Sequence, residues 1–201
     1  SLKAFLAGYN DVSVDIMACF DNEEVGTGTK QGADSTLLRD TLTRINSALG
    51  KTEEDYHRAL ASSFMLSADN AHAVHPNHPE HTDATNCTYM NEGVVVKSHA
   101  GQKYTSDGVS MAVVKALASG ADVPLQYFAN RSDKAGGSTL GNIAMAQASM
   151  NAVDIGLPQL AMHSSYETAG IKDTYYAITL MKALFDSHIQ ETSTHSLEIK
   201  R

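Results

Sequence analysis

Short apolar runs rich in β-branched residues alternate with segments of helical periodicity along this chain. Such runs are typical of buried strands, whereas apolar residues spaced three or four apart are typical of amphipathic helices. Strands are expected at residues 12–20, 64–69, 93–98 and 124–131, a strand leading into a loop at 152–164, and helices at 31–50, 52–63, 107–120, 138–150 and 173–188. The alternation predicts an α/β fold in which helices cover a sheet and functional groups lie at strand ends and on loops.

Local signals define several ends of these elements. Gly50 is expected to stop the first long helix, and Thr52 to cap the next one, whose first turn is acidic. The last helix is expected to direct its apolar residues inward, and the polar tail after it, residues 189–201, to be frayed. The inward residues of that helix are Ile178, Met181, Leu184 and Phe185.

Composition narrows the class of protein. A chain of 201 residues with 42% hydrophobic and 19% charged residues is long enough for one sizeable globular domain. A formal charge of −8 without a Lys/Arg block argues against nucleic-acid binding, and no apolar run is long enough for a membrane helix. The only cysteines, Cys19 and Cys87, cannot build a disulfide framework, so a reducing cytoplasm is expected.

Two adjacent glutamates, Glu23 and Glu24, follow the first apolar run. Like charges at the rim of a core are costly unless a cation is held nearby. In metal-dependent hydrolases one carboxylate binds the metal while another accepts a proton from the attacking water. Two solvated acids in a turn explain this stretch equally well.

A histidine-rich loop follows Asp69 at the end of the second expected strand. Asp69 is a candidate metal ligand, because metal sites favour carboxylates and imidazoles. Pro76 and Pro79 preclude a regular helix, so the histidine spacing does not by itself bring the rings together. The loop is equally explained as a weak surface metal trap or as a solvated segment. Its histidines are His72 and His75, candidates for substrate binding or for supporting the ligands, and His78 and His81, expected at the surface.

Three further features have both a functional and a structural explanation. His163 follows an apolar stretch; a lone histidine there is more often structural, but two acidic strand ends favour a ligand. Lys97 ends a strand and is either a partner for a substrate carboxylate or a surface lysine. The glycine-rich segment at 135–141 lacks a following Gly-Lys-Ser/Thr, so a tight turn is favoured over an anion site.

Taken in order, six stretches resemble the aspartyl aminopeptidase family of dinuclear zinc metallopeptidases. The resemblance extends from residue 20 to about residue 170, and the first and third stretches are its most specific parts. It implies a mixed β-sheet flanked by helices, as in a zinc-peptidase catalytic domain. The stretches are FDNEEVG, QGADS, SADNAHAVHPN, RSD, GGSTLG and DIGLPQLAMHSSYE.

The resemblance also implies roles at matching positions. Glu23 would be the general base, Glu24 and His163 would bind one zinc ion, and Asp69 would bind the other. His75 would stabilise the substrate or the tetrahedral intermediate. Cobalt or manganese would also suit such nitrogen and oxygen ligands. The residues placed near the bound peptide are His72, Lys97 and Tyr104.

The chain departs from the family pattern before Glu23. The histidine ligand and the metal-bridging aspartate that the family carries upstream cannot be placed, and an inserted dimerisation domain is absent. Residues 1–201 are therefore expected to be the C-terminal part of a catalytic domain whose N-terminal half is missing. Without a bridging carboxylate two dications repel, so the isolated chain should bind metal weakly or singly.

Three functions are compatible with the sequence. The first is a metal-dependent aminopeptidase within a homo-oligomer, acting on peptides, with acidic N-terminal residues as one candidate preference. The second is a truncated, catalytically incompetent fragment that serves as a structural or interaction piece, in which case the N-terminal half is a candidate partner. The third is a related carboxypeptidase or deacylase, against which SADNAHAVHPN argues.

Overall fold

A mixed four-stranded sheet forms the centre of the protein in the computed structural model, which describes residues 1–193 and 196–200. The outer pairs of strands are parallel, whereas the two inner strands are antiparallel. In spatial order the strands are β1 (Phe64–Ala68), β5 (Asn151–Gly156), β3 (Val94–Lys97) and β4 (Leu125–Phe128). The predicted α/β class with a mixed sheet is confirmed.

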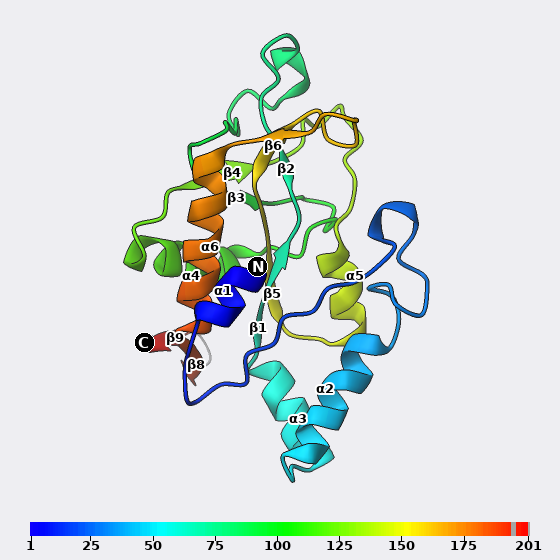
Figure 1. The fold of residues 1–201 in the computed structure, drawn as a ribbon, viewed down its shortest axis with the longest axis vertical. Coiled ribbons are helices and arrows are strands. Elements are labelled where there is room, and N and C mark those ends of the chain that lie inside the picture. The colour runs from blue at the N-terminus through cyan, green and yellow to red at the C-terminus, as the bar shows by residue number, and fades with distance from the viewer. Residues whose placement is uncertain (194–195, 201) are drawn as a thin grey trace.

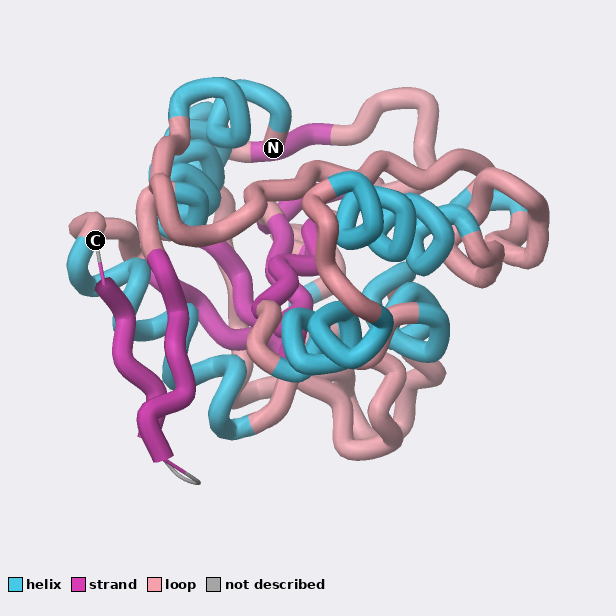
Figure 2. Tube along the Cα trace, turned by 90° about the horizontal axis from the view of Figure 1, so that it is seen from below, coloured by secondary structure: helices cyan, strands magenta, loops and turns pink. Residues whose placement is uncertain are grey.

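Helices cover both faces of this sheet (Figures 1 and 2). The main apolar core, which includes Val94, Val96 and Val153, packs against α1, α4 and α6, and a smaller core packs α5 against α2 and α3. Val95 belongs to a separate cluster with Tyr104, which shows that alternate residues of β3 face opposite sides of the sheet. The helices are α1 (Leu2–Ala7), α2 (Leu37–Ala48), α3 (Glu53–Ala61), α4 (Gly108–Gly120), α5 (Leu140–Gln147) and α6 (Ile171–Phe185).

Three short strands continue the chain beyond the carboxyl ends of β1 and β5. They form a separate sheet in the order β2-β6-β7, in which β2 follows β1 after two residues and β6 follows β5 after one. The strands are β2 (Ala71–His72), β6 (Pro158–Leu160) and β7 (Thr168–Ala169). In the part of the chain that the structure describes, no helix is both long and apolar enough to cross a membrane.

Most predicted elements are found, with shifted ends. The helix expected at 31–50 begins only at Leu37, and Gly50 adopts a positive φ of 73° just after its end. The strand leading into a loop that is expected at 152–164 is found as β5 and β6, which belong to different sheets and are followed by a loop. In α6, Met181 is buried, and the other residues expected to face inward pack partly buried against the main core.

The strand predicted at residues 12–20 is wrong. The segment is irregular, and Val12 and Val14 are 67% and 60% exposed. Its alternation of apolar and polar residues is typical of a strand, yet a strand also needs a neighbour to bond its backbone, and no described segment pairs with it. Glu23 and Glu24 therefore do not end a buried strand.

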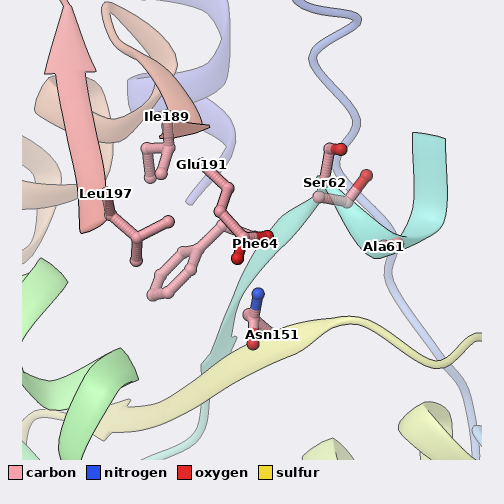
Figure 3. Close-up of a pocket in the computed structure, with 8 residues that line it drawn as sticks. Ala61, Ser62, Phe64, Asn151, Ile189, Glu191 and Leu197 are labelled. Carbon is pink, nitrogen blue, oxygen red and sulfur yellow. The ribbon is translucent and has the colours of Figure 1, made fainter. Parts of the chain in front are cut away.

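The frayed tail predicted at residues 189–201 is also wrong within the described residues. A hairpin of β8 (His188–Ser193) and β9 (Ser196–Lys200) forms there, and Ile189 and Leu197 pack against the main core. These side chains border a small pocket with Phe64 and Asn151 (Figure 3). Because Phe64 and Asn151 begin β1 and β5, this pocket lies at the opposite strand ends from Asp69. Residues 194–195 and 201 of the tail lie outside the described residues.

The helix cap at Thr52 yields a stability prediction. Thr52 and Asp55 form a capping box, since the Thr52 side chain accepts from the Asp55 N–H and the Asp55 carboxylate accepts from the Thr52 N–H. We expect Thr52→Ala to lower the free energy of unfolding by about 1 kcal/mol, as measured by urea denaturation.

Acid should remove part of this stabilisation. Hydrogen bonds from Thr52 hold the pKa of Asp55 below its usual value, so its contribution is present above the ordinary aspartate pKa and is lost as pH falls through the lowered value. The stability difference between the wild type and Asp55→Asn should therefore shrink on acidification. Glu54→Gln, in the same turn, is the control, and an unchanged difference at low pH would contradict the assignment.

Candidate metal centre and active site

Glu23 and Glu24 lie on a tight turn, the 3-10 helix η1 (Glu23–Val25). Asn22 precedes it in the left-handed conformation, with φ of 62°, which is uncommon for a residue other than glycine. The Asn22 amide donates to Thr29 Oγ1 at 3.1 Å and so fixes the start of the turn to the returning loop. The pair is thus positioned by a turn rather than by a strand end.

Glu24 and His163 meet at the surface of the protein. Glu24 Oε2 lies 2.8 Å from His163 Nε2, and both side chains are 65% exposed. His163 adopts a positive φ of 66°, and its N–H donates to Glu167 Oε1 at 2.6 Å. Unusual backbone conformations held by specific contacts are common at functional sites. An imidazole nitrogen and a carboxylate oxygen this close, and open to solvent, fit the donor set of zinc.

Asp69 is paired with a buried lysine. Lys97, at the end of β3, is only 2% exposed, and its Nζ donates to Asp69 Oδ2 and to the Asn70 carbonyl oxygen, both at 3.2 Å. The same Nζ lies 5.2 Å from the centre of the Tyr104 ring. The surface-lysine alternative is therefore wrong. Asp69 itself remains 35% exposed, so its carboxylate is still accessible to a ligand.

Electrostatic coupling connects Glu23 to the other charged groups. Burial raises the pKa of Glu23, the carboxylates of Asp69 and Glu24 raise it further, and His163 and Lys97 oppose this rise. Such coupling requires short separations. Glu23 therefore senses the charges of all four groups, but the ligand atoms of Glu24, Asp69 and His163 do not all lie within 4.8 Å of one another in the described residues.

The two predicted substrate residues His72 and Tyr104 border the same cluster. Loss of hydration lowers the pKa of His72, and the positive charges of Lys97 and His163 lower it further, against the opposing effect of Asp69. Burial raises the pKa of Tyr104, as do the negative charges of Asp154 and Asp69, whereas a hydrogen bond from Asn130 lowers it. Both side chains therefore sense Asp69.

His75 has its contacts elsewhere. Its Nδ1 accepts from the Asn77 N–H at 3.2 Å, and its ring lies 5.3 Å from that of His78. These contacts place His75 within the loop that follows β2, at the top of Figure 1. His78 and His81 are exposed, as predicted.

The glycine-rich segment at 135–141 is anchored through its carbonyl and hydroxyl groups. Lys103 Nζ donates to the Gly136 carbonyl oxygen at 2.6 Å, and Thr139 Oγ1 donates to Asp154 Oδ1 at 2.8 Å. Thr139 directly precedes α5. The segment thus connects structural elements, but residues 135–139 are extended or irregular rather than the expected tight turn, and α5 begins at Leu140.

The buried Asp154 binds segments that carry the site residues, and the sequence did not predict this role. It is fully buried in β5 and accepts hydrogen bonds from Ser67 Oγ at 2.6 Å and from the Thr105 N–H at 2.6 Å, besides that from Thr139. Ser67 lies two residues before Asp69, and Thr105 directly follows Tyr104. An aspartate within an apolar strand was the available signal, since a buried carboxylate needs such partners.

A mixed α/β sheet whose loops gather carboxylates and imidazoles beyond β1 and β5 defines a zinc-peptidase-like catalytic fold. Residues 2–185 match the model of the aminopeptidase I zinc metalloprotease family, M18. The chain belongs to this family.

Similar proteins are longer than this chain, which matches only part of each. A probable M18 family aminopeptidase 2 of Clostridium novyi is 50% identical over 174 residues, covering 87% of this chain and 40% of that protein. Aspartyl aminopeptidase 1 of Schizosaccharomyces pombe is 39% identical over 178 residues, covering 89% and 37%. The solved mApe1 dodecamer of S. cerevisiae has a TM-score of 0.73 at 32% identity and covers 83% and 36%. The chain thus spans about two fifths of these curated relatives.

Close packing beside Asp69 yields a prediction at Gly156. A Cβ at this position would lie 2.0 Å from the Asp69 carbonyl oxygen, so an added methyl group must displace the backbone that carries Asp69. We expect Gly156→Ala to lower the free energy of unfolding by about 1–3 kcal/mol in urea denaturation. Gly28→Ala is the control, because nothing lies within 4 Å of its Cβ. Equal midpoints for both variants would contradict the close packing.

Proposed function

We propose that the protein carrying this chain is a metal-dependent aminopeptidase that removes N-terminal residues from peptides. The observation that carries the proposal is the contact of Glu24 with His163, at 2.8 Å, next to Glu23 in the sequence. Membership of a family described as zinc metalloproteases supports the same reaction class. Family members elsewhere carry the name aminopeptidase.

Each acidic group is assigned one task. Glu24 and His163 hold one zinc ion, and Asp69 contributes to a second. Zinc, when bound, polarises the scissile carbonyl and makes water a stronger nucleophile. The Glu23 carboxylate accepts the proton of the attacking water and returns it to the leaving amine, because it lies next to Glu24 without sharing that residue's contact with His163.

The remaining residues orient the peptide. Lys97 is proposed to act near a substrate oxygen, from its position beside Asp69 and the Asn70 carbonyl oxygen, to both of which its Nζ donates. Tyr104 and His72 border the same space, and His75 is proposed to stabilise the tetrahedral intermediate. Fixed carboxylates can bind the α-ammonium group of a free N-terminus. An acidic first residue is proposed because several relatives are named aspartyl aminopeptidases.

We further propose that residues 1–201 form the C-terminal part of the catalytic domain and act within a homo-oligomer. A related structure is a dodecamer, and the chain spans about two fifths of its curated relatives. The exposed Val12 and Val14 fit a strand that pairs with further polypeptide. The same exposure favours the second candidate, an incompetent fragment that binds an N-terminal half. A cytoplasmic location is proposed from the free Cys19 and Cys87.

Replacing Glu23 tests the general base. In the complete protein that carries this chain, we expect Glu23→Gln to lower kcat by about 100-fold to 10,000-fold on leucyl and aspartyl chromogenic amides. Its metal content, measured by elemental analysis, should be unchanged, since the amide keeps the shape of the side chain.

The control for this variant is Glu54→Gln, which changes an exposed acid in α3. Retained activity in Glu23→Gln would remove Glu23 from the role of base. Loss of metal together with activity would instead make Glu23 a ligand.

Replacing His163 tests the metal assignment. His163→Ala should lose one metal ion per chain in the complete protein, because Glu24 alone cannot replace an imidazole donor. His57→Ala is the matched control: His57 is also exposed and also faces a glutamate, with its Nε2 4.0 Å from Glu53 Oε1. Unchanged metal content in His163→Ala would show that His163 is structural.

A further inference from the structure

We propose that His78, Glu80 and His81 form a second binding site, for a single divalent transition-metal ion of the zinc and copper class. This site is built by one turn of the loop after β2, and it shares no residue with Glu24, Asp69 and His163. The inference does not rest on the proposed peptidase function.

The backbone brings the three side chains together. The turn is the 3-10 helix η2 (Pro79–His81), which directly follows His78. A 3-10 helix has three residues per turn, so residues i and i+3 lie above one another. His78 and His81 are such a pair, and their ring centres are 5.7 Å apart. Because the loop forms a 3-10 turn here, the three-residue separation brings both imidazoles to one side, where they can bind the same ion. In an extended loop the same separation would not do so.

The ligand atoms converge on one side of this turn. His78 Nδ1 lies 3.2 Å from Glu80 Oε1, and His81 Nε2 lies 3.8 Å from the same oxygen. One ligand atom from each of the three residues lies within 4.8 Å of the others. Within the described ranges 1–193 and 196–200, this is the one group of three histidine, cysteine or acidic residues with that property.

The turn is held in place by its surroundings. Arg131 Nη1 donates to the Glu80 carbonyl oxygen and ties η2 to the segment after β4. At the base of the loop, Thr88 Oγ1 donates to the His72 carbonyl oxygen at 2.6 Å. Pro79 at the first position of η2 restricts its backbone further. A site that is ordered before binding loses less conformational entropy when the ion arrives.

The donor set decides the class of ion. Two imidazole nitrogens and one carboxylate oxygen suit zinc, copper and nickel, whereas magnesium and calcium prefer oxygen ligands alone. The Arg131 guanidinium does not oppose a cation strongly, because Asp133 accepts two hydrogen bonds from it at 2.8 Å. The side chains are about 60% exposed, so binding removes little hydration and leaves room for water at the remaining positions.

Paramagnetic broadening in the 201-residue chain tests the site directly. Substoichiometric copper(II) should broaden the imidazole NMR signals of His78 and His81 first. His57 is the internal control, because it also faces a glutamate but has only that one partner at 4.0 Å. Equal broadening of His57, or none at His78 and His81, would overturn the proposal.

Zinc equilibrium dialysis with variants separates this site from the candidate active site. The double variant His78→Ala/His81→Ala should lose about one zinc equivalent, whereas the triple variant Glu24→Gln/Asp69→Asn/His163→Ala should retain it. Glu80→Gln should weaken binding about tenfold or more through loss of the anionic donor, with circular dichroism to verify the fold. A double variant that binds as many zinc equivalents as the wild type, or zinc lost only from the triple variant, would refute this site without affecting the proposed peptidase function.

Discussion

The carboxylate of Asp154 joins the segments on which the candidate site is built. It is fully buried between β1 and β3, and it accepts from Ser67, Thr139 and Thr105. A buried carboxylate without partners is strongly unfavourable, so these bonds have to form together for the charge to be tolerated. One group thereby fixes the end of β1, the start of α5 and the loop of Tyr104.

The loops of the candidate site carry the carboxylates of Glu23, Glu24 and Asp69, and nearby positive groups neutralise their charge only in part. Lys97 is buried against Asp69, and His163 contacts Glu24, whereas Glu23 forms no ion pair with any described residue and its pKa is raised. Burial raises the pKa of Glu23 most, and the neighbouring carboxylates of Asp69 and Glu24 raise it further. Dications at the surface oxygens of Glu24 and Asp69 would relieve this repulsion, which is the physical basis for regarding the cluster as a metal centre.

Local sequence patterns predicted the elements whose stability is largely local or lies in the core. The Thr52 cap and the apolar strands β1, β3 and β5 follow from propensity and hydrophobicity, and the structure contains them. The segment 12–20 was mispredicted because a strand also depends on a partner, which periodicity cannot supply. The tail was mispredicted because most residues of β8 and β9 are polar, so that the sequence gives little sign that Ile189 and Leu197 pack on the core.

The candidate site shows the same division between local and distant information. Glu23, Glu24, Asp69 and His163 were identified as polar residues after apolar runs, but nothing in their spacing gives the 2.8 Å contact of Glu24 with His163. The roles of Asp154 and Gly156 were not predicted. Asp154 accepts hydrogen bonds and Gly156 leaves room for the Asp69 backbone, and both roles become evident only when β1 and β5 are paired. The His78–His81 turn differs in that its candidate ligands lie within four consecutive residues, so the conformation of a single turn, which Arg131 helps to hold, decides whether its histidines form a site.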